Sequence, residues 1–136
     1  METGSAMALQ VAVHEALAGD GELTALLGGA RIHDDVPYAA EFPYVTIGDV
    51  TSFEAGTADA AAEEHAMTLT AWSRAGGRGE VQAVMARIRT LLHDRPLALD
   101  GHVLVNLRHV AHEARREADG RTFRGIVRFR AVTEPA

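Results

Sequence analysis

Apolar residues recur at helical spacing in two segments of the chain. The first segment, 9–17, ends at the turn 19–21, where a glycine can adopt the left-handed conformation that commonly terminates helices. A short second helix is predicted over 23–27, with Gly28-Gly29 as its end. The most regular stripe lies over 81–92, and its apolar positions are Val81, Val84, Met85, Ile88, Leu91 and Leu92. This pattern predicts a long helix that lies across a sheet.

Alternation with a period of two residues predicts the strands. In the segment 65–74, the apolar positions Met67, Leu69 and Ala71 share one face, and Thr68, Thr70 and Trp72 share the other. The other predicted strands lie over 31–36, 44–47, 97–99, 103–117 and 122–133. Strands with one apolar face are typical of a sheet that packs against helices on that face.

Glycine-containing dipeptides mark the turns between these strands. Asp100-Gly101 predicts a type I′ hairpin turn, and Asp119-Gly120 predicts a second turn. The segment 54–64 is rich in Ala, Gly, Asp and Glu without a period, which predicts an exposed, mobile loop.

The element order predicts one α+β domain. A helix, a short helix, strands, a long helix and three antiparallel strands favour an antiparallel, possibly mixed, β-sheet covered by two main helices. The length of 136 residues fits one domain, which we assign to 7–136. Residues 1–6 are small and polar, and we interpret them as a flexible N-terminal arm or the remnant of a tag, with Met7 as a candidate natural start.

Charge is distributed unevenly along the chain. Residues 1–68 carry twelve acidic residues and one arginine, whereas residues 69–136 carry twelve arginines and seven acidic residues. The asymmetry is either an accident of strand order or the complementary pair of surfaces that a head-to-tail interface would use. The chain has no cysteine and no apolar run as long as a membrane span. We therefore expect no disulfide, no thiolate chemistry and no membrane partner.

The residue patterns of catalytic and metal sites are missing. His14-Glu15 has no second histidine at zinc-helix spacing. His109 and His112 are predicted to lie on opposite faces of a strand, where they could not hold one metal together without a bulge. Ser73 lacks the surroundings of a nucleophile, and the glycine-rich segment 76–79 lacks the lysine of a phosphate-binding loop. We expect no catalytic residue, no metal and no cofactor, and we predict that the protein is not an enzyme.

An arginine stripe on the last strand, formed by Arg124, Arg128 and Arg130, is a candidate contact surface. The stripe is either the solvated outer face of an edge strand or a contact surface. As a contact surface it would bind the acidic segment 54–64 of a neighbouring copy or DNA phosphates. An exposed Ile126 within the stripe would favour a protein partner. Trp72 also favours a protein partner, unless the segment 54–64 buries it. The proposed subunit or partner interface comprises Glu54, Asp59, Glu63, Glu64, Trp72, Arg124, Ile126, Arg128 and Arg130.

Several short motifs occur in an order that resembles one family. The motifs are Ala8-Leu9-Gln10, the segment 20–29, Arg31-Ile32-His33-Asp34-Asp35-Val36-Pro37, Phe42-Pro43-Tyr44-Val45-Thr46-Ile47-Gly48, Leu69-Thr70-Ala71-Trp72-Ser73-Arg74 and Arg128-Phe129-Arg130-Ala131-Val132-Thr133-Glu134. Together they resemble the phage tail-terminator-like (tail completion) proteins, in particular the versions found in gene transfer agents, the phage-like particles that package host DNA.

The resemblance implies a structural role in a particle. Members of that family have a lambda tail-terminator-like fold and form rings, generally hexameric, on the head-proximal end of the tail tube. The implied partners are further copies of the chain, the tail tube protein and a head-tail connector or stopper protein, with DNA only passing through the ring lumen. The implied location is the tail-neck junction of a virion or phage-like particle, assembled in the bacterial cytoplasm. The family brings no catalytic residues.

Two other functions stay open at this point. The chain could be another head-tail joining protein, such as a stopper or neck component, or a nucleic-acid-binding module that uses the arginine stripe. In a ring, each copy would need two different, complementary flanks. We predict that the segment 54–64 becomes ordered only on assembly, which hydrogen exchange in the free chain and in the ring would test.

Overall fold

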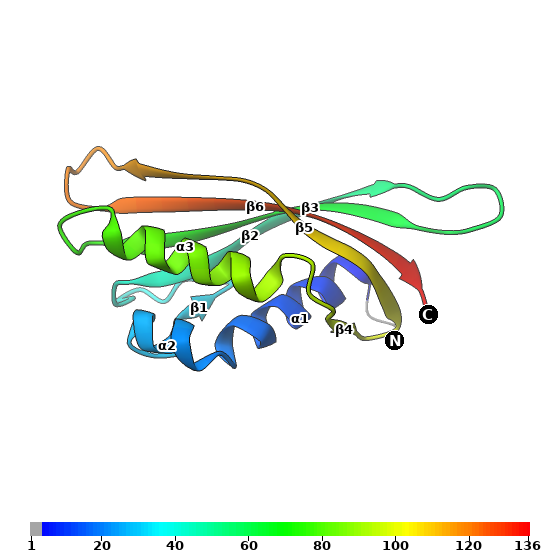
Figure 1. Ribbon diagram of the computed structural model, residues 1–136, viewed down its shortest axis with the longest axis horizontal. Coiled ribbons are helices and arrows are strands. Elements are labelled where there is room, and N and C mark those ends of the chain that lie inside the picture. The colour runs from blue at the N-terminus through cyan, green and yellow to red at the C-terminus, as the bar shows by residue number, and fades with distance from the viewer. Residues whose placement is uncertain (1–3) are drawn as a thin grey trace.

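A computed structural model describes residues 4–136 of the chain. Within these residues the protein forms three helices and a six-stranded sheet (Figure 1). The helices are α1 (Ser5–Ala18), α2 (Gly21–Leu27) and α3 (Gly79–Leu92). The strands are β1 (Ile32–His33), β2 (Tyr44–Glu54), β3 (Glu63–Ser73), β4 (Ala98–Leu99), β5 (His102–Arg116) and β6 (Phe123–Pro135). The predicted α+β class is confirmed.

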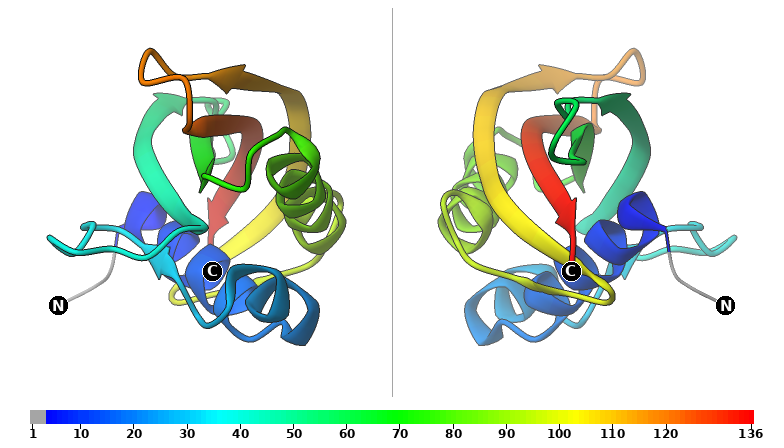
Figure 2. Two further views of the ribbon diagram at one scale, coloured as in Figure 1. Left: turned by 90° about the vertical axis from the view of Figure 1, so that its left-hand side faces the viewer. Right: turned by 90° about the vertical axis from the view of Figure 1, so that its right-hand side faces the viewer.

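The sheet is mixed and its strand order is not sequential. The order is β1-β2-β3-β6-β5-β4, with β1 parallel to β2 and the other neighbouring pairs antiparallel. The last strand, β6, therefore lies in the interior of the sheet and not at an edge. The strands curl around the helices, and the β2–β3 and β5–β6 hairpins extend toward opposite ends of the long axis (Figures 1 and 2).

The helices bury the apolar stripes that the sequence contains. In α1, Leu9, Val13 and Leu17 are buried, and the buried positions of α3 are Val81, Val84, Met85, Ile88 and Leu92. They pack against strand residues of one sheet face, including Met67 and Phe129. Burial of each such side chain is worth about 1.5–3 kcal/mol, so this packing is what holds the helices on the sheet.

The ends of α1 and α2 differ from one another. The predicted end of the short helix at Gly28-Gly29 is confirmed, and Gly28 ends it in the left-handed conformation with a φ of 79°. Gly19, after α1, has a φ of −84°, so the left-handed end predicted there is wrong. Asp20 instead begins the next helix at once, because its side chain accepts a hydrogen bond of 2.8 Å from the Leu23 N–H.

Part of the segment assigned to an N-terminal arm lies in a helix. Residues 1–3 lie outside the described residues, but Ser5 and Ala6 form the first turn of α1. The Ser5 side chain is buried, and its hydroxyl donates a hydrogen bond of 2.7 Å to Glu63 Oε1 on β3. This bond ties the start of α1 to the sheet.

Two predicted turns also need correction. The segment 54–64 is not a loop throughout, since β2 ends at Glu54 and β3 begins at Glu63. The connection between them is closed by backbone hydrogen bonds from Ala55 to Ala62 and from Thr57 to Ala60. The turn at Asp100-Gly101 is present, but only Gly101 has a positive φ, of 74°, whereas a type I′ turn needs positive φ at both residues. The predicted turn type is therefore wrong.

Helix α3 lies very close to the sheet at Gly125 on β6. A Cβ atom at Gly125 would come within 2.6 Å of Val81 Cγ2 and 2.8 Å of Met85 Sδ, which is too close for any real side chain. Glycine is therefore required here by the distance between helix and strand, and it sets how deeply α3 sits on the sheet.

A buried histidine joins three strands of the sheet. The ring of His65 on β3 contacts Ser52 Oγ on β2 at 2.7 Å and Thr133 Oγ1 on β6 at 2.8 Å. The residue has no exposed surface, and this burial lowers the pKa of His65 from its ordinary value of 6.5. We therefore expect a neutral ring that is held by two hydroxyl groups at neutral pH.

Candidate assembly surfaces

The predicted arginine stripe lies on the sheet face opposite the helices, and its charges are paired within the subunit. Arg128 and Arg130 are exposed and Arg124 is half-buried. The ion pairs are Arg124–Glu117 (2.9 Å), Arg128–Glu113 (3.8 Å) and Arg130–Glu64 (3.0 Å). Because β6 is an interior strand, its neighbours supply these carboxylates: Glu64 lies on β3, Glu113 lies on β5, and Glu117 directly follows β5. The interpretation as the outer face of an edge strand is therefore wrong.

Ile126 does not provide an exposed apolar centre for this stripe. Only 8 % of its surface is exposed, because its strand lies between Thr70 on β3 and Glu113 on β5. The prediction of an exposed Ile126 is thus wrong. This residue is buried between neighbouring strands of its own sheet.

Trp72 lies at the end of β3 that is farthest from the 55–62 connection. Its ring stacks on Tyr44 with centroids 6.2 Å apart, and its indole N–H donates a hydrogen bond of 3.1 Å to Thr46 Oγ1. The Arg124 guanidinium lies 6.0 Å from the Trp72 ring centroid. The segment 54–64 therefore does not cover Trp72, and the indole is instead part of a small half-buried aromatic cluster.

The predicted acidic residues gather on the β2–β3 hairpin. Glu54 and Glu63 are cross-strand neighbours, and Asp59 lies in the connection between the strands. Glu64 pairs with Arg130, but Glu54 and Asp59 form no ion pair within residues 4–136. This hairpin extends beyond the helices at one end of the molecule (Figure 1). Its tip therefore presents uncompensated negative charge.

The β5–β6 hairpin at the opposite end presents positive charge. Arg116 and Arg121 form no ion pair within the described part of the chain, although the Arg116 guanidinium lies 5.2 Å from the Phe123 ring. In contrast, Asp119 accepts hydrogen bonds from the Thr122 hydroxyl and from the backbone of the turn, which lower the pKa of Asp119 to about 2. Uncompensated acidic and basic groups therefore lie at opposite ends of the long axis.

A histidine cluster that the sequence did not predict lies at the β5 edge. The register of β5 against β6 jumps from His109↔Phe129 to Ala111↔Arg128, which leaves Val110 as an extra, bulged residue. The bulge brings His109 and His112 onto one face, with ring nitrogens 2.9 Å apart. The prediction that these two histidines lie on opposite faces is therefore wrong, and the bulge is the reason.

The loop after α3 completes this cluster. His93 Nδ1 accepts a hydrogen bond of 3.0 Å from the His109 backbone N–H, while His93 Nε2 lies 3.2 Å from the Asp94 carboxylate. These contacts fit a neutral His93 with its proton on Nε2. Burial, followed by the charge of Arg89, lowers the pKa of His109. Within residues 4–136 no three histidine or carboxylate groups are placed to hold a metal ion.

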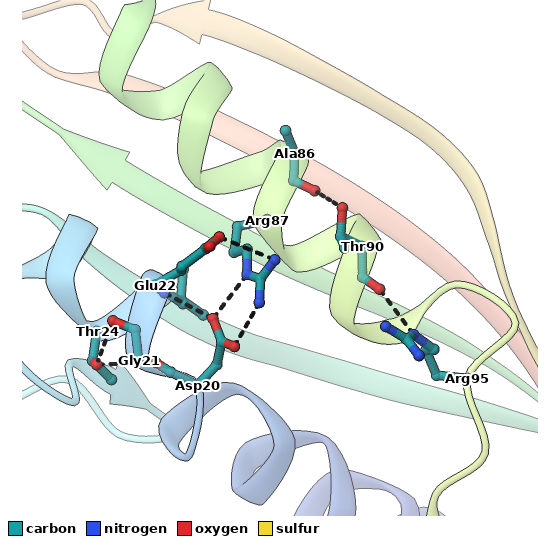
Figure 3. Close-up of polar contacts among 9 residues, drawn as sticks. Asp20, Gly21, Glu22, Thr24, Ala86, Arg87, Thr90 and Arg95 are labelled. Carbon is teal, nitrogen blue, oxygen red and sulfur yellow. Dashed lines mark hydrogen bonds and ion pairs between the residues drawn. The ribbon is translucent and has the colours of Figure 1, made fainter.

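A groove lies between α3 and β5 beside these histidines. It has a volume of about 380 Å³ and is lined by Ala86, Arg89, Thr90, His93 and His109. The Arg89 Nε atom is buried and has no hydrogen-bond partner within the described residues. Arg95 lies at the same end of α3, where its Nε donates to the Thr90 carbonyl at 3.3 Å (Figure 3). The groove is therefore positively charged, and the Arg89 Nε beside it is a hydrogen-bond donor without a partner within the described residues.

The position of α3 is fixed by a charged clamp to the start of α2. The Arg87 guanidinium donates two hydrogen bonds, of 2.8 and 2.7 Å, to the Asp20 carboxylate and lies 3.1 Å from Glu22 (Figure 3). These bonds, together with the Leu23 N–H, lower the pKa of Asp20 to about 2. Bidentate geometry of this kind restricts how α2 and α3 move against each other.

An arm formed by residues 34–43 leaves the body of the molecule on the side of β1 and β2. In both end-on views it projects away from the helices and the sheet (Figure 2). Arg31 closes its base by contacting the Phe42 carbonyl at 3.1 Å and the Glu41 carboxylate at 2.7 Å. At its tip, the Ala40 N–H donates to the Pro37 carbonyl, and Tyr38 in this turn is fully exposed, with a relative accessibility of 107 %.

One feature of the sequence indicates this arm. Tyr38 follows Pro37 in a segment that also holds Asp34 and Asp35. Proline and aspartate are typical of turns, and a turn at this place leaves the Tyr38 ring exposed. No helix within residues 4–136 combines the length and the apolar character needed to span a membrane.

Comparison with known proteins gives a consistent result. The family model of "Tail completion protein gp17" matches residues 11–134. Tail completion protein gp17 of Bacillus phage SPP1 is 32 % identical over 91 residues, which span 65 % of this chain and 66 % of that protein, just under two thirds of its length. A chain in the structure "Virion of native gene transfer agent (GTA) particle" superimposes with a TM-score of 0.88 at 28 % identity, covering 97 % of this chain and 99 % of that chain.

Proposed function

The chain belongs to the tail completion protein gp17 family, and we propose that it is the tail terminator of a phage or gene transfer agent particle. As a tail completion protein it is a component of such a particle. In the proposed role it forms a ring, hexameric in our interpretation, which caps the tail tube, stops its polymerisation and joins it to the head connector. DNA passes only through the lumen. The role is structural and not enzymatic, as membership of this family suggests.

The full-length match to a chain of a gene transfer agent virion carries this proposal. The shape of the subunit is also suited to a closed ring, because such a ring needs two different flanks on each copy. The arm 34–43 lies on one side of the body, and α3 with the edge of β5 lies on the other (Figure 2).

We propose in addition that the charged ends of the sheet contact neighbouring proteins in the particle. Within residues 4–136, Glu54 and Asp59 of the acidic hairpin form no ion pair, and neither do Arg116 and Arg121 at the other end. Contacts between such surfaces steer association more than they strengthen it, and exposed pairs are worth about 0.2–1 kcal/mol each. Apolar contacts must therefore supply most of the affinity.

The test is to delete the gene in cells that produce the particle and to image the particles by electron microscopy. A terminator stops tube growth, so we expect tails that are longer than normal and not attached to heads. Complementation with the intact chain should restore normal length. Free tails of normal length beside emptied heads would instead indicate a stopper or another neck protein, and normal particles would refute both roles.

A further inference from the structure

An exposed aromatic residue and an open basic groove lie on opposite flanks of the subunit. We propose that Tyr38 of one copy enters the groove between α3 and β5 of the next copy, with the aspartates of the arm facing the arginines of the groove. The proposal rests on the proposed ring function, since it names the contact that would join one subunit to the next.

The arm presents its aromatic residue in a fixed geometry. Arg31 holds the base closed through Phe42 and Glu41, and the turn at Pro37 places Tyr38 at the tip. Six consecutive residues, 34–39, are exposed, and the Tyr38 side chain is fully exposed among the residues that the structure describes. Tyrosine combines a large apolar surface with few rotatable bonds, which makes it a common anchor of protein interfaces.

The groove has the chemistry to receive this arm. Its volume of about 380 Å³ leaves space for an aromatic ring, and the His93 and His109 rings form part of its wall. The buried Arg89 Nε lacks a hydrogen-bond partner within residues 4–136. The Arg89 guanidinium also lines the groove and forms no ion pair within these residues, so a carboxylate of an arriving segment would be stabilised beside it.

The charges of the two surfaces are complementary. Asp34 and Asp35 on the arm form no ion pair within the described residues. Around the groove, Arg89 and Arg95 also lack a carboxylate partner in the same part of the chain, whereas Arg108 lies 3.6 Å from Asp94. The uncompensated charges are thus negative on one flank and positive on the other, which favours head-to-tail pairing over pairing of identical flanks.

Cross-linking tests this contact directly, because the natural chain has no cysteine. We would introduce Ala39→Cys, an exposed position beside Tyr38 that leaves the tyrosine in place, together with Thr90→Cys in the groove, and treat assembled particles with a short thiol-specific cross-linker. The expected result is a ladder of covalent oligomers that ends at the ring size. A matched control combines Ala39→Cys with Ala58→Cys, an exposed position in the β2–β3 connection, and should give no ladder.

Substitutions measure how much the contact matters. Tyr38→Ala should weaken subunit association by roughly tenfold or more, whereas Tyr38→Phe should keep most of it. Because Tyr38 is fully exposed in the single subunit, the melting temperature of the unassembled chain should not change, which separates loss of the contact from loss of folding. Asp35→Arg and Arg89→Asp should each reduce assembly, and the double variant should recover it, since every interface would again carry opposite charges.

The outcomes distinguish this inference from the proposed function. Rings that form normally with Tyr38→Ala, or particles whose Ala39→Cys/Thr90→Cys pair gives no ladder, would overturn the arm-and-groove contact and leave the terminator role standing. If Tyr38→Ala forms rings of normal mass that fail only to join heads, the arm binds another protein, and this result also overturns the arm-and-groove contact. Normal tails after deletion of the gene would refute the proposed function and this inference together.

Discussion

The close approach of α3 to β6 makes Gly125→Ala a demanding test of the structure. The added Cβ would lie 2.6 Å from Val81 Cγ2, 2.8 Å from Met85 Sδ and 2.9 Å from Met85 Cγ, whereas ordinary contacts lie at 3.4–4 Å. Met85 is flexible and can move its side chain aside. Val81 is β-branched and has one preferred rotamer in a helix, so relief requires a shift of α3 itself.

The expected loss follows from this geometry. Overpacking of a close-packed core costs about 1–3 kcal/mol, and we expect about 2 kcal/mol here. For a chain of this length, each kcal/mol lowers the melting temperature by about 3–4 °C, so the variant should melt roughly 7 °C lower. Arg89 on α3 and His93 directly after it both line the groove beside β5, so a shift of the helix should also change the shape of this groove.

Thermal and urea unfolding followed by circular dichroism would measure the effect. Gly77→Ala is the matched control, because no atom lies within 4 Å of its added Cβ and its backbone does not have positive φ, so its effect should stay within about 0.5 kcal/mol. The double variant Gly125→Ala/Val81→Ala should lose about 1 kcal/mol less than the sum of its single variants, because the new methyl occupies the space that valine leaves. Equal stability of Gly125→Ala and Gly77→Ala, or strict additivity with Val81→Ala, would refute the reasoning.

Three further predictions concern polar groups. Asp20 has a folded pKa of about 2, below its ordinary 3.8, so the Asp20–Arg87 clamp stabilises the fold above about pH 4 and is lost as the pH falls toward 2. Asp20→Asn should therefore be less stable at neutral pH, and its urea midpoint should approach that of the natural chain in acid; a constant gap would contradict this. Burial lowers the pKa of His65, so the natural chain should lose stability as the pH falls below about 6.5, whereas His65→Gln, which does not titrate, should lose less; parallel pH profiles in urea unfolding would exclude a buried neutral ring. Arg130→Ala removes an exposed ion pair with Glu64 and should cost less than about 1 kcal/mol in the same assay, and a loss above about 2 kcal/mol would show that the pair is not simply a surface contact.

The local parts of the fold could be read from the amino-acid sequence. The apolar stripe over 81–92 predicted α3, and alternation over 65–74 predicted β3, because helical and strand periodicities depend on neighbouring residues. The motif order also indicated the tail completion family, which the family match confirms. The turn type at Asp100-Gly101 failed because the dipeptide permits several backbone conformations, and the strands around it select one.

The candidate surfaces depended on pairings between distant residues. The uneven distribution of charge along the sequence does not produce one acidic and one basic face of the folded subunit. The strands β3 and β6 lie side by side, and Glu64 pairs with Arg130 in the same subunit. Likewise, Ile126 alternates with arginines yet is buried, since β6 became an interior strand.

The sequence by itself determined the order and kind of the elements, since these follow from periodicity within each segment. Only the tertiary structure decided which side chains meet at the edges. The bulge at Val110 joins His109 to His112, and the arm places Tyr38 in solvent on the flank opposite the groove. A one-residue change of register moves every later side chain to the other face of a strand, and that register is set by partners that are far away along the chain.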